Sequence, residues 1–240
     1  MQPYFFPYIG YWQLMNAVDR YVIFDDVNYI KKCWINRNRI LVNGQPVYFN
    51  LPILDASQNK LIMDTRVNPD PKLKEKNLFT IKCTYKRAPF FCEIYPIIEN
   101  VIRCEEESLS RYLFHSICTI ARALDIKCEF HISSTIEKDE SLKGEDKVLA
   151  ICEKLDATDY YNPIGGTELY HDEKFRDHGM ELRFMQTDHI EYQQFRKDDP
   201  FVPNLSIIDV LMFNGIIGTK ELLKACKPVT HEELSKNACR

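Results

Sequence analysis

The second half of this chain alternates between helical and extended patterns, and this alternation constrains the fold more than any other feature. Apolar residues recur with helical spacing in one segment and form a short β-rich run in the next, three times in succession. Strands separated by helices favour parallel pairing, with the helices covering the sheet. The sequence therefore predicts an α/β fold with a mostly parallel sheet covered by helices. The expected helix and strand pairs are 108–126 with 127–133, 144–157 with 159–166, and 168–179 with 180–186.

The first half adds two further features. Asn43 and Gly44 separate two β-rich runs within 39–52, which is a strong signal of a β-hairpin. Helical patterns then follow at about 70–125, and we expect them to form a helical insertion or subregion. No linker rich in glycine or serine divides the chain, so we predict one domain over residues 1–240.

The composition weighs against several classes of protein. A net charge of −4 and a pI of about 5.9 give little support to nucleic-acid binding, which favours a basic excess. No apolar run is long enough to span a membrane, and the first residues do not have the order of a secretory signal. Nine cysteines without CxxC spacing fit reduced thiols. We therefore expect a cytoplasmic protein with a small-molecule partner, and the residues indicate no particular metal or cofactor.

Residues 25–39, DDVNYIKKCWINRNR, form the least ordinary segment. Two acids end an apolar strand, and a dense set of basic, amide and aromatic residues follows. Carboxylates at a strand end can act as a base, bind a metal or orient a cation. Arginine can hold a phosphate, and an aromatic ring can stack on a base or sugar. The segment is thus a candidate ligand loop, and the alternative is a solvated loop with an Arg–Asp surface pair. The candidates are Asp25, Asp26, Tyr29, Lys31, Trp34, Asn36, Arg37 and Asn38.

Three other segments could complete a polar pocket, each with a structural alternative. The aromatic turn at 2–11 opens a helix and could bind a ligand or simply pack in the core. The glycine pair at 162–166 allows close approach of a ligand, although a plain turn is favoured. The segment 203–209 begins a helix, where capping is the favoured role, with Ser206 and Asp209 in a capping-box-like arrangement. The candidates are Gln2, Tyr8, Tyr11, Gly165, Gly166, Asn204, Ser206 and Asp209.

Four stretches taken together resemble the WbqC-like family. They are QPYFFPYIGYWQL, YVIFDDVNYIKKCWINRNRI, PIGGTELY and FVPNLSIIDVLMFNG, and their order and spacing match over about residues 2–215. The resemblance implies an association with O-antigen and other surface-polysaccharide clusters, and some members are described as glycine transferases acting on amino sugars. It carries over no assigned catalytic role. Relatives usually have a short apolar strand before the QP pair, whereas Met1 stands in its place here, so we expect either an internal start or a missing first strand.

The function implied is transfer of an aminoacyl group, glycyl in the leading hypothesis, to the amine of a nucleotide-linked amino sugar. From residue chemistry, Asp25 or Asp26 would be the base, and Asn36, Asn38 or a backbone amide would stabilise the oxyanion. Lys31, Arg37 and the turn at 165–166 would hold the diphosphate. Two rivals stay open: a ligase or nucleotidyl transferase using ATP and Mg²⁺, and a non-catalytic protein that binds nucleotide sugars.

Overall fold

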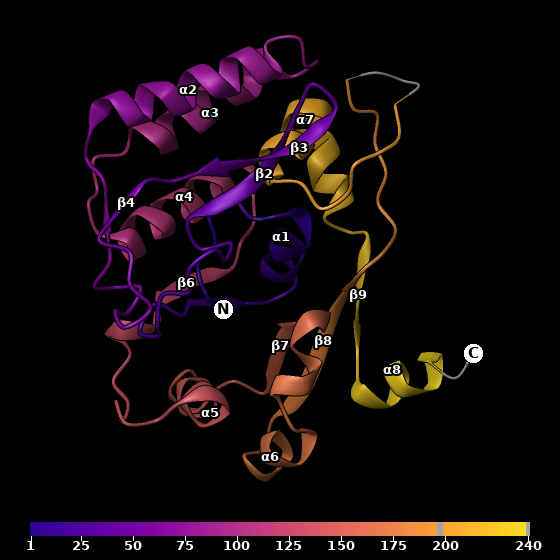
Figure 1. The fold of residues 1–240 in the computed structure, drawn as a ribbon. Helices are drawn as coiled ribbons and strands as arrows, with labels where there is room; N and C mark the ends of the chain where they lie inside the picture. Colours follow the sequence, from indigo (N-terminus) through magenta and orange to yellow (C-terminus); the bar gives the residue numbers. More distant parts are fainter. Residues whose placement is uncertain (196–198, 239–240) are drawn as a thin grey trace.

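The computed structural model describes residues 1–195 and 199–238 (Figure 1). The helices are α1 (Ile9–Asn16), α2 (Pro71–Tyr85), α3 (Phe91–Arg103), α4 (Leu109–Ala123), α5 (Gly144–Lys154), α6 (Asp172–Asp177), α7 (Ile207–Leu222) and α8 (His231–Ala238). The strands are β1 (Arg20–Ile23), β2 (Arg37–Val42), β3 (Gln45–Asn50), β4 (Ile53–Leu54), β5 (Arg66–Val67), β6 (Glu129–Ile132), β7 (Asp159–Pro163), β8 (Glu181–Thr187) and β9 (Cys226–Val229). Short 3₁₀ turns occupy Ser133–Thr135 and Ile164–Leu169.

The predicted α/β class is confirmed, but the parallel strands are divided between two small sheets. β1 pairs in parallel with β6, and β7 pairs in parallel with β8, whose other edge carries β9 in antiparallel orientation. The predicted hairpin is present as β2 and β3, with Asn43 and Gly44 both at positive φ in its turn. β4 and β5 form a further antiparallel pair.

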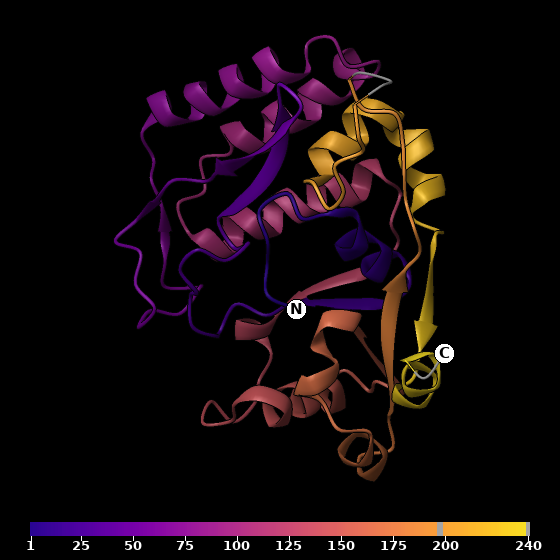
Figure 2. The same ribbon diagram turned by 45° about the vertical axis from the view of Figure 1, so that its right-hand side comes forward.

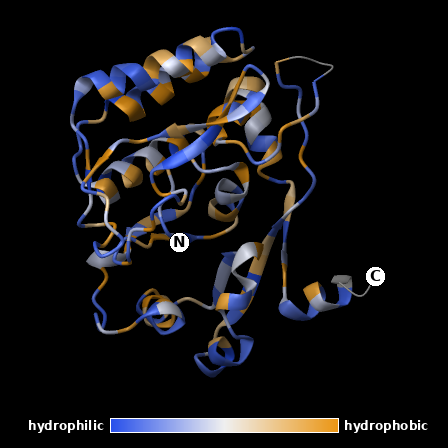
Figure 3. Cartoon of the chain, viewed as in Figure 1, coloured by the Kyte–Doolittle hydropathy of each residue, from blue (hydrophilic) through white to orange (hydrophobic). Residues whose placement is uncertain are grey.

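The molecule has two packed regions that lie one above the other in both ribbon views (Figure 1, Figure 2). The larger hydrophobic core takes residues from α1 to α4, α7, β1 and the hairpin. The smaller core joins α5, α6, β8 and β9 around Phe175 and Phe184. Hydrophobic (orange) and hydrophilic (blue) residues alternate along α2 and α5 in Figure 3, as expected of helices with one buried face.

Gln13 of α1 connects the two regions, although it is fully buried and polar. Its amide nitrogen donates to the carbonyls of Leu222 and Ala225, at 2.9 and 3.0 Å. Its amide oxygen accepts from the Thr187 hydroxyl at 2.8 Å. The side chain therefore joins α1 to the end of β8 and to the segment that follows α7.

One predicted boundary is wrong, and the structure adds a kink and two elements that were not predicted. The helix expected from residue 168 begins at Asp172, because Ile164–Leu169 forms the 3₁₀ turn. α7 continues to Leu222, with Gly215 at a φ of 65° marking a kink inside it. β9 and α8 lie in a region where no element was predicted. Within the described residues, no helix is both long and apolar enough to cross a membrane.

Candidate functional site

The four residues Asn36–Arg39, which we call the NRNR run, lie at the start of β2 and bind the loops around it. Three of those loops contain a non-glycine residue with positive φ: Phe6 at 43°, Lys32 at 60° and Asn204 at 56°. The carbonyl of each of these residues accepts a hydrogen bond from a side chain of the run. Such backbone conformations cost free energy and persist only where surrounding contacts hold them. The run therefore fixes the positions of three unusual loop conformations.

The side chains of the two asparagines of the run are hydrogen bonded to other residues of the protein. Asn36 accepts from the Tyr29 hydroxyl at 2.7 Å and donates to the Leu51 carbonyl at 3.0 Å. Asn38 is buried and donates to the carbonyls of Phe5 and Phe6 at 3.2 and 2.8 Å, while its oxygen accepts from the Arg39 amide. The predicted oxyanion role of these asparagines would require the amide groups to exchange these partners, and that role stays a prediction.

The two arginines of the run form a face with two aromatic rings. The Arg37 guanidinium lies 4.3 Å from the Tyr48 ring centre, and the Arg39 guanidinium lies 5.7 Å from that of Trp34. The two rings are 6.4 Å apart. We call Trp34, Arg37, Arg39 and Tyr48 the arginine–aromatic face.

The charge of this face is not neutralised within the part of the chain that the structure describes. No ion pair there involves Arg37 or Arg39, so the surface Arg–Asp pair considered as an alternative is not among the described contacts. The Nε atoms of both arginines are buried and have no hydrogen-bond partner among the described residues. Lys31 and Lys32 are exposed beside the same segment. Together these groups make a cationic surface with unused donors and two flat rings.

Asp25 lies apart from this face, beyond the end of β1. The residue is 1% exposed, and both carboxylate oxygens accept hydrogen bonds. The donors are the hydroxyls of Ser110 and Ser134, at 2.6 and 2.9 Å, and the Ser134 amide at 3.0 Å. The contacts give Asp25 the role of joining β1 to α4 and to the 3₁₀ turn after β6.

Asp26 is held by two cations. Lys138 and Lys147 lie 2.9 and 3.3 Å from one carboxylate oxygen, and the Ser133 hydroxyl donates to the other at 2.6 Å. Burial on its own raises the pKa of Asp26, but the Ser133 hydrogen bond and the two ammonium groups outweigh it and lower the pKa below its ordinary value. The Asp26 side chain is 12% exposed, so it keeps some access to solvent.

Asp209 is fully buried, and its contacts differ from the predicted capping-box-like arrangement with Ser206. Ser206 caps α7 as expected, its hydroxyl accepting from the Ile208 amide at 3.2 Å. The Asp209 carboxylate does not complete a capping box, because it accepts from Tyr85, Tyr192 and Gln194 at 2.9, 2.8 and 3.0 Å. Burial raises the pKa of Asp209. This carboxylate therefore ties α7 to α2 and to the segment before it.

The remaining predicted residues divide into those near the NRNR run and those distant from it. Ser206 shares the Phe6 carbonyl with Asn38, which brings the segments 2–11 and 203–209 to the run. Gln2 and Tyr11 are joined to each other, since the buried Tyr11 hydroxyl donates to the Gln2 carbonyl at 3.0 Å. Tyr8 precedes α1, where its ring lies against Gly10. Gly165 and Gly166 lie in the 3₁₀ turn after β7, and neither forms a hydrogen bond with the run among the described residues.

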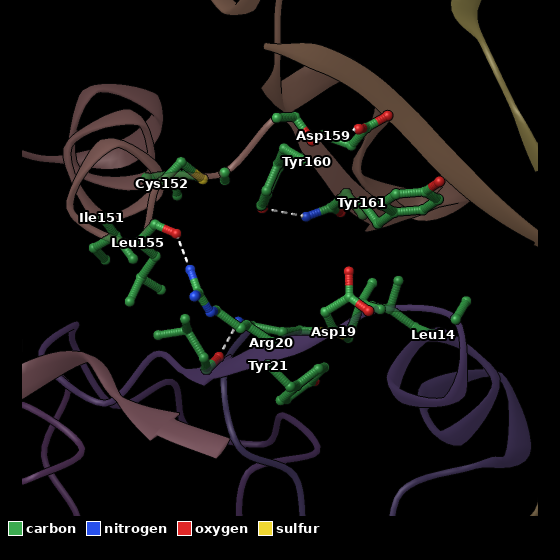
Figure 4. A pocket seen from close by; sticks show the side chains of 18 of the residues that line it. Leu14, Asp19, Arg20, Tyr21, Ile151, Cys152, Leu155, Asp159, Tyr160 and Tyr161 are labelled. Atoms are coloured by element: carbon green, nitrogen blue, oxygen red, sulfur yellow. Dashed lines mark hydrogen bonds between the residues drawn. The ribbon is translucent and has the colours of Figure 1, made fainter. Parts of the chain in front are cut away.

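A cavity of about 490 Å³ lies elsewhere, between β1 and β7 (Figure 4). Its lining includes Tyr21, Tyr160 and Tyr161 together with Asp19 and Arg20. None of residues 25–39 lines it, and of the other predicted walls it includes only Asn162. Within the described residues, no group of three or more histidines, cysteines and acids is arranged to hold a metal ion.

The sequence reasoning missed four residues of these sites. Arg39 closes the NRNR motif, so its place beside Arg37 could have selected it. The hairpin register, which the Asn43–Gly44 turn fixes, places Tyr48 opposite Arg39. Arg37 lies two residues before Arg39 and so on the same face of the strand, where it contacts the Tyr48 ring. Lys138 and Lys147 reach Asp26 from distant segments, and nothing in their local sequence indicates it.

Comparison with known proteins gives one family. The model of the WbqC-like protein family matches residues 2–221. An uncharacterized protein of Mycobacterium tuberculosis, Rv1507c, is 25% identical over 237 residues, which cover 95% of this chain and 97% of that protein. No solved structure matches the chain.

Proposed function

Since the chain belongs to the WbqC-like protein family, we propose that it acts in surface-polysaccharide biosynthesis by transferring an aminoacyl group to a nucleotide-linked amino sugar. The group transferred is glycyl in this proposal. The observation that supports it most is the arginine–aromatic face, where two guanidinium groups and two rings share one surface.

The binding step follows from the chemistry of that face. A nucleotide sugar combines a diphosphate, which arginine binds through charge-assisted hydrogen bonds, with flat or ring-shaped groups that pack against aromatic side chains. The buried, unpartnered Nε atoms of Arg37 and Arg39 are donors for such an anion. Lys31 is a candidate for a further contact to the diphosphate, whereas the turn at Gly165 and Gly166 forms no hydrogen bond with the NRNR run among the described residues.

The transfer step needs a base and an acyl donor. In the proposal, the sugar amine attacks the carbonyl carbon of an activated aminoacyl ester, a C–N bond forms, and the ester C–O bond breaks. The amine proton passes through the base to the departing alcohol. Asp26 is the better candidate base, because its side chain is 12% exposed whereas the Asp25 residue is only 1% exposed. The lysines keep Asp26 ionised at neutral pH, which is the form that accepts a proton.

One observation favours a second candidate function, the binding of nucleotide sugars without catalysis. Both oxygens of Asp25 are hydrogen bonded, and Asp26 already pairs with Lys138 and Lys147. Acids engaged in this way have a complete structural role, and the pKa of Asp26 is lowered, away from neutrality, by the Ser133 hydrogen bond and the two lysines. A protein of this kind would bind the sugar nucleotide at the same face and form no product.

A thermal-shift screen followed by mass spectrometry separates the two functions. Nucleotide-linked amino sugars should raise the melting temperature of the protein, and the free amino sugars should raise it less. Each stabilising sugar is then incubated with glycyl esters and the protein, and the mass of a glycyl group is sought on the product. Product from wild-type protein and none from Asp26→Asn supports transfer with Asp26 as base. Binding with no product from any donor supports the second function, and no binding at all contradicts both.

A further inference from the structure

The outward side of α2 carries lysines arranged around one exposed aromatic residue. Phe79 is 68% exposed. Lysines stand three and seven residues before it and three and seven residues after it: Lys72, Lys76, Lys82 and Lys86. A helix turns by about 100° per residue, so all four lie within about 60° of Phe79 around the helix axis. We call these five residues the lysine–Phe79 face.

The opposite side of α2 attaches the helix to the protein. Leu78, Ile81 and Tyr85 are buried there. The four lysines are exposed, and α2 lies at the outer edge of the molecule in both ribbon views (Figure 1, Figure 2). The lysine–Phe79 face is therefore open to solvent along the whole helix.

The charge of this face stands out from the rest of the chain. Residues 71–87 contain six basic residues and one acid, so their net charge is +5, whereas that of the whole chain is −4. The acid is Glu75, which pairs with Arg103 of α3. Among the described residues, no ion pair involves any lysine of the face or the neighbouring Arg87. The face is therefore a stripe of cations without counterions.

Exposed lysines of other helices behave differently. Lys224 lies 2.8 Å from Glu221, and Lys236 lies 2.6 Å from Glu232, each within one helical turn. Such pairs are typical of a helix face whose only contact is with water. Cations alone, with an exposed ring at their centre, are typical of a helix that lies on an anionic membrane surface.

We propose that the lysine–Phe79 face docks the protein on a bilayer that contains anionic phospholipids. The ammonium groups bind the lipid phosphates, and each one strengthens binding by about fivefold. The Phe79 ring enters the boundary between headgroups and acyl chains, while the apolar stems of the lysines lie along it. The docking is peripheral, because the apolar side of α2 stays packed on the protein.

A bilayer fits this face better than a nucleic acid does. Lysine binds phosphate as a point charge, which suits mobile headgroups, whereas arginine is the usual reader of fixed bases and phosphates. The net charge of −4 opposes wrapping by a long polyanion, but a flat surface meets only one side of the molecule. The stripe from Lys72 to Lys86 is about 21 Å long and straight, so a plane contacts all of it at once.

The test is co-sedimentation of the protein with vesicles of phosphatidylglycerol and phosphatidylcholine in equal parts. Wild-type protein should bind these vesicles and should not bind vesicles of phosphatidylcholine alone. Raising the salt from about 0.1 M to about 1 M should weaken binding by about tenfold or more. Changing the four lysines of the face to glutamine should weaken it by about 100-fold or more.

A matched variant changes four exposed lysines elsewhere to glutamine and so has the same net charge. They lie outside α2 and none of them is in an ion pair among the described residues: Lys60, Lys143, Lys154 and Lys227. This variant should bind the vesicles within about twofold of wild-type protein. Equal loss in the two variants, or no binding of wild-type protein to anionic vesicles, would overturn the proposal. Tighter binding to an RNA oligomer than to the vesicles would also overturn it.

A fluorescence probe tests the contact of the ring without removing any charge. The emission of Phe79→Trp should shift to shorter wavelength on anionic vesicles and become protected from acrylamide. Leu169→Trp, at a 65% exposed position in the 3₁₀ turn after β7, should show neither change. Equal responses of the two probes would contradict insertion of Phe79. None of these readouts uses a sugar ligand, so their failure is distinct from failure of the proposed function.

Discussion

The NRNR run shows how one short motif combines structural and binding roles. The side chains of its asparagines are hydrogen bonded to other parts of the protein, while each of its arginines keeps a buried Nε without a partner among the described residues. Buried donors are normally satisfied, so an unpartnered pair on one surface points to a ligand. The asparagine amides of the run therefore hold the neighbouring loops in place, and the guanidinium groups are available to bind a ligand.

Asn38 should be important for stability. Asn38→Ala removes the donors to the Phe5 and Phe6 carbonyls and releases the positive φ of Phe6. We expect a loss of about 2–3 kcal/mol in the free energy of unfolding, measured by urea denaturation. The control Asn16→Ala, at an exposed position of α1, should change it by less than about 0.5 kcal/mol. Equal effects of the two substitutions would contradict the structural role of Asn38.

Asp26 should make stability depend on pH in the acid range. Its folded pKa is lowered, so its stabilising contribution is present above the unfolded pKa, near 3.8, and is lost as the pH falls through the folded value. The unfolding free energy of wild-type protein should therefore fall more steeply than that of Asp26→Asn as the pH falls below about 5 and through the folded pKa. Parallel curves from urea denaturation at these pH values would show that Asp26 is not held by Lys138 and Lys147 as described.

At this scale the sequence indicates which residue types gather but not what each one contacts. The cationic character of 25–39 and the capping role of Ser206 could be read from the residues themselves. The position of Asp209 could not, because its donors Tyr85 and Tyr192 come from segments that only the tertiary fold brings together.

Among the elements, α7 depends on a glycine at its kink. Gly215 has a φ of 65°, and a Cβ there would lie 2.6 Å from the Phe90 ring. Gly215→Ala should lower the free energy of unfolding by about 1–3 kcal/mol, from strain and overpacking. Gly165→Ala is the control, since a Cβ at that residue meets nothing within 4 Å. A Gly215→Ala protein as stable as the control would show that the kink is not required.

The elements with strong local signals were predicted correctly. The hairpin follows from Asn43 and Gly44, and α4 follows from its periodic apolar residues. α8 and β9 lack such signals: β9 holds Pro228 and alternates poorly, and α8 carries few apolar residues. These elements form because β8 offers an edge and the smaller core offers a surface, which is information outside their own sequence.

In the molecule as a whole, Gln13 joins the two packed regions. Gln13→Ala removes three hydrogen bonds and leaves the Leu222 and Ala225 carbonyls without that donor. We expect about 2–4 kcal/mol of lost stability, because the side chain is buried. Differential scanning calorimetry should show an earlier or broader transition, in which the region of β8 and β9 unfolds first. An unchanged transition would show that packing of α1 alone joins the regions.

The arginine–aromatic face is the proposed binding site for a nucleotide-linked amino sugar, and isothermal titration calorimetry tests this assignment directly. We expect Arg37→Ala, Arg39→Ala and Tyr48→Ala each to weaken binding of a sugar that stabilises wild-type protein by about tenfold or more. Arg122→Ala, at an exposed position of α4 remote in sequence from the face, should leave the dissociation constant unchanged. If all four variants bind with the wild-type dissociation constant, the face is not the binding site.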